Sequence, residues 1–92
     1  MSDFLPGTVI GVPCEVKRGP FSGEHLIGFE TVHGPVTGFV HENELKQMEP
    51  GKWYVRAVVQ SIDRDQINVW ICGSFFTTNG IATIPRDMAL AA

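Results

Sequence analysis

The sequence predicts a small all-β protein, a barrel of five short strands with one helical turn between the third and the fourth strand. Ten glycines and six prolines punctuate the 92 residues and separate short runs in which apolar and polar side chains alternate, a pattern typical of strands joined by tight turns. A chain of 92 residues suits one domain with a modest core. The one helix-like stretch, residues 42–48, ends before Pro50-Gly51 and is too short to make the fold helical.

The first strand is predicted over residues 8–17. One face of this strand is apolar, because every second residue is apolar: Ile10, Val12, Cys14 and Val16. Pro13 lies within the strand and cannot donate a ladder hydrogen bond, which indicates a sheet edge or a bulge there.

Four further strands are predicted over residues 24–32, 36–41, 53–62 and 66–73. Gly28 in the middle of the second strand allows the sharp coiling that a small barrel needs. The helical turn of residues 42–48 joins the third strand to the fourth, and the polar residues 63–65 form the last turn. Five strands and a helical turn in this order are the arrangement of an OB-type barrel. An SH3-like barrel is the alternative.

The barrel is expected to comprise residues 1–73, followed by an extension of residues 74–92. This extension is apolar enough to pack back on the barrel as an extra strand, through Phe75, Phe76, Ile81 and Ile84. Its last residues are expected to form a frayed helix or a flexible end.

The charge balance restricts the kinds of partner that the protein can bind. The formal net charge is −3 and the isoelectric point is about 5.4, whereas a strong nonspecific nucleic-acid binder usually has a basic face or a pI above about 9. The supply of basic residues is Lys17, Arg18, Lys46, Lys52, Arg56, Arg64 and Arg86. A nucleic acid would therefore have to be held by a local positive patch.

The sequence contains no signature of a membrane protein, a metalloprotein or an enzyme. No stretch approaches the roughly 18 apolar residues of a membrane span, and residues 1–7 do not resemble a signal peptide, so a cytoplasmic protein without a membrane partner is expected. Cys14 and Cys72 are expected to be buried thiols, too few and too far apart for a disulfide framework or a zinc site. No catalytic triad, phosphate loop or metal-ligand spacing is present, so we expect no cofactor and no catalysis.

Two motifs carry a resemblance to a known family. Gly-Phe-Val-His at residues 38–41 is followed by Glu-Leu at 44–45, and an Asp-Arg turn at 63–64 joins two alternating strands. These motifs resemble the S1 family of RNA-binding OB-fold domains, most specifically over residues 36–73. The resemblance implies a single-stranded RNA ligand. The chain departs from the family in a longer first hairpin, in the absence of a Phe-Gly-x-Phe pattern, and in Gln66, where the family has a basic residue.

The resemblance also implies where RNA would bind. The family's aromatic, histidine and turn positions correspond here to Phe29 or Phe21, Phe39, His41, Asp63 and Arg64. Strand parity places Phe39 and His41 on the same face, where bases can stack on both rings. Contacts to phosphates are expected from the basic residues Arg56, Arg64, Lys17 and Arg18.

Each of these residues also has a structural interpretation. The phenylalanines can pack in the core, His41 can bond a backbone group at the strand end, and the basic residues can be solvated surface charges. Asp63 and Asp65 are interpreted as residues that cap their own turn.

A protein–protein interaction or assembly module, with a protein partner or a second copy of the chain, is the second functional hypothesis. Trp70 falls on the outward side of its strand, where an exposed tryptophan indicates either a ligand or a cover formed by the C-terminal extension. The candidate partner-binding residues are Trp70, Phe75 and Phe76. Salt separates the two hypotheses, because binding through phosphates weakens steeply with salt and binding through an apolar interface does not.

Overall fold

The computed structural model describes residues 4–18, 23–75 and 79–91. It is all-β, and these residues include two short 3-10 helices and no α-helix. The elements in chain order are β1 (Val9–Arg18), β2 (Glu24–Thr31), β3 (Gly34–His41), η1 (Glu42–Glu44), β4 (Leu45–Glu49), β5 (Lys52–Asp63), β6 (Gln66–Trp70), β7 (Ser74–Phe75), β8 (Ile81–Pro85), η2 (Arg86–Met88) and β9 (Leu90–Ala91). Phe21 and Phe76 lie outside the described residues.

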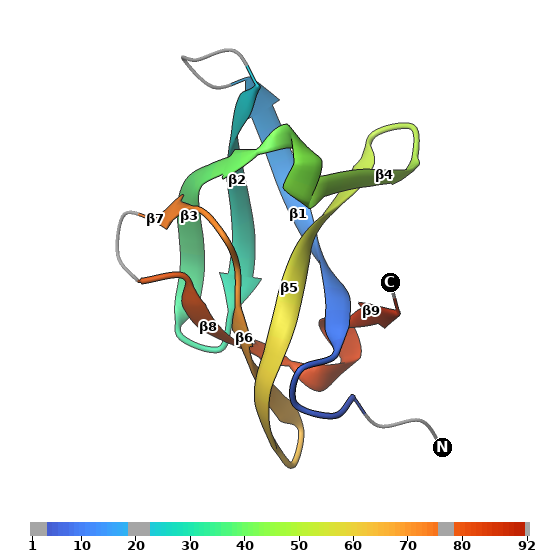
Figure 1. Ribbon diagram of the computed structural model, residues 1–92, viewed down its shortest axis with the longest axis vertical. Coiled ribbons are helices and arrows are strands. Elements are labelled where there is room, and N and C mark those ends of the chain that lie inside the picture. The colour runs from blue at the N-terminus through green and yellow to red at the C-terminus, as the bar shows by residue number, and fades with distance from the viewer. Residues whose placement is uncertain (1–3, 19–22, 76–78, 92) are drawn as a thin grey trace.

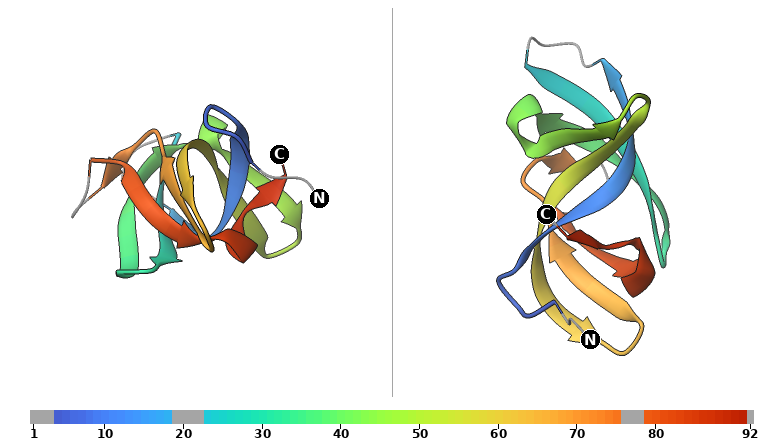
Figure 2. Two further views of the ribbon diagram at one scale, coloured as in Figure 1. Left: turned by 90° about the horizontal axis from the view of Figure 1, so that it is seen from below. Right: turned by 90° about the vertical axis from the view of Figure 1, so that its right-hand side faces the viewer.

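The strands form one antiparallel sheet that curls into a half-barrel (Figures 1 and 2). The strand order is β7-β3-β2-β1-β5-β6-β8, and β4 and β9 add to β5 and β1 off this path. The curl brings together strands that lie far apart in this order. The backbone N–H of Val32, which follows β2, donates to the carbonyl of Thr83 in β8 at 2.9 Å. A pronounced curl is expected because strands twist and the long β5 contains a register shift between Val59 and Ser61.

The core fills the concave side of the sheet with mostly β-branched side chains, whose shape suits a pleated surface. Its members are Ile10, Val12, Ile27, Phe29, Val40, Leu45, Val55, Ala57, Val59, Ile67, Val69, Ile71, Ala82 and Ile84. They follow the period-two pattern of the sequence, so the alternation that predicted the long strands also selects the core.

The segment after β3 differs from the helix predicted over residues 42–48. Only Glu42–Glu44 is helical, as a 3-10 turn, and Leu45–Glu49 extends as β4 along β5. Leu45 is buried, whereas the other residues of β4 are exposed. The pairing with β5 supplies backbone hydrogen bonds that a helix of this length would gain only at a high nucleation cost.

The C-terminal residues add strands to the sheet. Strand β8 pairs with β6 along its whole length, from Gln66 opposite Pro85 to Trp70 opposite Ile81. Ala82 and Ile84 of β8 are core residues. Helix η2 then turns the chain so that β9 pairs with β1.

Candidate nucleic-acid interface

The outer side of β1, β2 and β3, here called the hairpin face, carries the residues that the sequence singled out for RNA. Directly opposed residues of neighbouring strands share a face, and the pairing places in one row Lys17, Leu26, Phe39 and Ser74. Phe39 is half-buried in this row, and His41 is exposed two residues further along β3. Phe39 and His41 therefore lie on the same face of β3, as strand parity predicted.

Leu26 is a residue of the hairpin face that the sequence interpretation missed. It lies opposite Phe39 and is half-buried. The pairing of Leu26 with Phe39 could have been predicted from the two-residue turn Val32-His33, because a turn that short fixes the register of the two strands it joins. With that register, an apolar pair stands at the centre of the face.

His41 has a structural role at the end of β3. Its Nδ1 accepts a hydrogen bond from the backbone N–H of Asn43 at 3.1 Å, which caps η1. A neutral imidazole that accepts at one nitrogen carries its proton on the other, so Nε2 is the atom left to donate to a ligand. Nε2 points toward Gly23, where an added Cβ would lie 3.6 Å away.

Phe29 does not belong to the hairpin face, which corrects the expectation that it stacks on bases. Its side chain is only 5% exposed, because it lies on the inward face of β2 opposite Val36. The ring packs edge-on against Phe75, with 6.2 Å between centroids and 84° between planes. Phe75 is thereby packed against the core and is not an exposed partner-binding residue.

The hairpin face is acidic. Glu15, Glu24 and Glu30 lie on it by the same strand pairing, and Lys17 is the basic side chain described there. Arg18 ends β1, but its side chain is not described. An excess of carboxylates produces a negative potential that repels phosphates, so this face alone is poorly suited to an RNA backbone.

The other predicted cations are distributed over two distant places. Arg56 is exposed on the outer side of β5, opposite Gly11. Arg64 lies in the β5–β6 turn with a φ of 56°, and its carbonyl accepts from Nη1 of Arg86 at 3.4 Å. In Figure 1 this turn lies at the lower end of the molecule, whereas η1 lies in its upper half. Arg64 and Asp63 are therefore not neighbours of His41, which corrects their assignment to one site.

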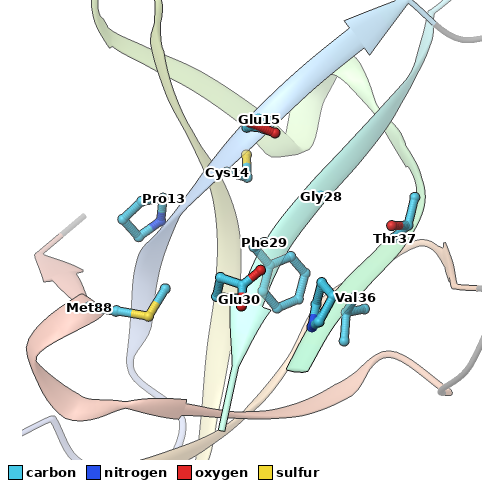
Figure 3. A pocket seen from close by; sticks show the side chains of 10 residues that line it. Pro13, Cys14, Glu15, Gly28, Phe29, Glu30, Val36, Thr37 and Met88 are labelled. Atoms are coloured by element: carbon cyan, nitrogen blue, oxygen red, sulfur yellow. The ribbon is translucent and has the colours of Figure 1, made fainter. Parts of the chain in front are cut away.

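A cavity of about 520 Å³ opens where β1 and β2 separate, beyond the pair Glu15 and Gly28 (Figure 3). Phe29 and Cys14 line it, and Met88 of η2 faces it from the other side. Burial raises the pKa of the Cys14 thiol from 9.0 to about 12, because a thiolate is poorly solvated there. The thiol is therefore protonated at neutral pH and is a poor nucleophile.

The two cysteines should differ strongly in reactivity. Cys72 is exposed and Cys14 is partly buried, which corrects the expectation of two buried thiols. At pH 8 we expect iodoacetamide to alkylate Cys72 at least about a hundredfold faster than Cys14, as followed by peptide mass spectrometry. Equal alkylation of both thiols in the folded protein would contradict this environment.

The free energy of unfolding should also fall as pH rises from 9 toward 12, because Cys14 ionises at a lower pH in the unfolded chain than in the folded protein.

An apolar row crosses the outer side of the other half of the sheet. The pairing places directly opposite one another Val9, Val58, Trp70 and Ile81, on β1, β5, β6 and β8. Trp70 is 40% and Ile81 is 47% exposed. In the described residues, the C-terminal extension pairs beside Trp70 in the sheet, and the backbone of Gly80 lies against the indole, which remains 40% exposed.

Within the described ranges, no three His, Cys, Asp or Glu side chains are grouped closely enough to hold a metal ion. The described helices are too short to span a membrane. Comparison with known proteins found no matching family, no matching curated protein and no matching solved structure.

Proposed function

We propose that the chain is a non-enzymatic binding module for single-stranded RNA, built on an OB-type barrel similar to S1 domains. The strand order β3-β2-β1-β5-β6 supports the barrel type, with η1 between β3 and the next long strand. The further strands β4, β7, β8 and β9 are additions to that plan.

One observation carries the ligand class: Phe39 and His41 lie on the outer side of β3, where that strand runs into η1. A half-buried phenylalanine offers a ring against which any base can stack, and the Nε2 of His41 offers a hydrogen-bond donor. Glu15, Glu24 and Glu30 disfavour phosphates on the hairpin face, and η1 carries two further carboxylates. The phosphates would therefore have to be held by the exposed cations Lys46 and Arg56, which lie beyond η1 on β4 and β5.

Loss of either ring should weaken RNA binding. Phe39→Ala and His41→Asn are each expected to reduce affinity for a short mixed-sequence RNA about tenfold, since a base stacked on an aromatic side chain is worth roughly 1–3 kcal/mol. Asparagine keeps a side-chain acceptor for the η1 cap and removes only the ring. Fluorescence anisotropy with labelled RNA at low salt measures the affinity.

Thr37→Ala is the matched control, because Thr37 precedes Phe39 on the same face of β3 and offers no ring. Its affinity should equal that of the unmodified protein. The proposal fails if Phe39→Ala and His41→Asn behave like this control.

A protein-interaction or assembly module is the second candidate, and the apolar row favours it. Four apolar side chains in register, two of them large and exposed, form a surface that could dock a protein. The net charge of −3 is also easier to reconcile with a protein partner. Binding through the row should persist at a salt concentration that abolishes RNA binding.

A further inference from the structure

A groove of about 240 Å³ lies at the corner where η1, β4, β5 and β1 meet. Of these elements, η1 follows His41 directly in the chain. This corner groove is lined by Val9, Ile10, Asn43, Glu44, Lys46, Tyr54 and Arg56. It is smaller than the roughly 300–1,000 Å³ of pockets that enclose drug-sized molecules. Its size therefore suits one small unit of a ligand.

Tyr54 is the aromatic wall of the corner groove and is held in place by a glycine. Its ring lies on the backbone of Gly11 in β1, so closely that a Cβ added there would lie 2.9 Å from Cε2. The ring is half-buried and borders the groove. A ring fixed in this way loses little conformational entropy when a ligand stacks on it.

Two cations flank this ring. Lys46 of β4 lies opposite Tyr54, and Arg56 follows Tyr54 on the same side of β5. Both are exposed, and neither has a carboxylate within ion-pair distance in the described part of the chain. By contrast, the nearby Lys52 is engaged by Glu49 at 3.0 Å.

The remaining polar side chains of the groove come from η1. Glu44 is half-buried and Asn43 is exposed. A carboxylate repels a phosphate but accepts hydrogen bonds from hydroxyl groups. The groove thus offers cations, an aromatic ring and hydroxyl acceptors within one small space, the complement of a phosphate, a base and a ribose.

We propose that the corner groove binds one nucleotide, with its phosphate at Lys46 and Arg56 and its base against Tyr54. The inference rests on the proposed RNA function and gives it a second, cationic subsite beyond the hairpin face. An RNA strand whose neighbouring base stacks on Phe39 and His41 would reach the groove across η1. A free nucleotide offers the same chemistry as a nucleotide within RNA. The experiment therefore has one arm with RNA and one with a free nucleotide, which distinguishes these two ligands.

The experiment measures the affinity of labelled single-stranded RNA against salt for Lys46→Gln, Arg56→Gln and Lys52→Gln. Each phosphate contact contributes about 0.7 to the slope of log affinity against log salt for a single strand. Lys46→Gln and Arg56→Gln should each lower that slope by about 0.7 and weaken binding several-fold at low salt. Lys52→Gln removes the same charge outside the groove and should change neither quantity.

NMR titrations with uridine monophosphate and with inorganic phosphate form the second arm. We expect the nucleotide to shift the amide signals of Tyr54 and Arg56 more than phosphate does, and Tyr54→Leu to reduce the shifts.

The outcomes separate the two proposals. RNA binding that is unchanged in Lys46→Gln and Arg56→Gln would overturn the groove and leave the RNA function standing. Nucleotide binding at the groove without RNA binding would support the groove and end the RNA function. Phosphate shifts as large as those from the nucleotide, or no shifts from either, would overturn the nucleotide site.

Discussion

Replacing Ile84 by alanine is expected to lower the free energy of unfolding by about 2–5 kcal/mol. Ile84 lies on β8, is 0% exposed and packs in the core opposite Ile67 of β6. Truncation to alanine removes buried methyl groups and leaves a cavity that the closely packed interior cannot fully close. Urea denaturation followed by far-UV circular dichroism measures the loss.

Ile81→Ala is the matched control for this substitution. Ile81 lies on the same strand, but its side chain is 47% exposed on the outer face. Its truncation should change stability by about 0.5 kcal/mol or less, as surface substitutions usually do. Equal stabilities of the two variants would mean that β8 is not part of the cooperative core and that the barrel is complete without it.

Replacing Gly38 by alanine should also destabilise the protein, by about 1–3 kcal/mol or more. Strand β7 pairs with β3 and approaches it so closely that a Cβ on Gly38 would lie 2.6 Å from the carbonyl oxygen of Ser74 and 2.8 Å from Cα of Phe75. Backbone atoms cannot rotate away from such a contact, so the two strands would have to separate. Urea denaturation of the variant gives the change in free energy.

Gly28→Ala tests whether the effect comes from the close approach of β7. Gly28 lies one position away in the same β2–β3 ladder, opposite Thr37. An added Cβ there meets no atom closer than 3.8 Å, so stability should stay the same or rise slightly, since alanine loses less backbone entropy than glycine. If both variants lost stability equally, the close approach of β7 would not be the cause.

The long strands could be predicted because their signal is local. Alternation of apolar residues indicated the first strand over 8–17, and the structure has Val9–Arg18. Strand β4 could not be predicted, since its residues after Leu45 are all exposed and, apart from Met48, polar, and they show no alternation. Only its pairing with β5, a tertiary contact, makes that segment extended.

The candidate site was predictable only in part for the same reason. Parity within β3 was enough to place Phe39 and His41 together. Phe29 was misplaced because the resemblance, and not the parity of β2, assigned it to the site; parity puts it with Ile27 on the inward face. Arg64 was misplaced because the 12 residues of β5 separate its turn from η1. The corner groove was invisible in the sequence, since Lys46 and Tyr54 become neighbours only through the pairing of β4 with β5.

The most direct test of the RNA-binding account is an NMR titration of isotope-labelled protein with a short mixed-sequence single-stranded RNA at low and at moderate salt. The account predicts shifts centred on Phe39, His41 and Arg56 that fade as salt increases. An absence of shifts at low salt, or shifts confined to the row of Val58, Trp70 and Ile81 that salt does not weaken, would contradict it and favour a protein partner.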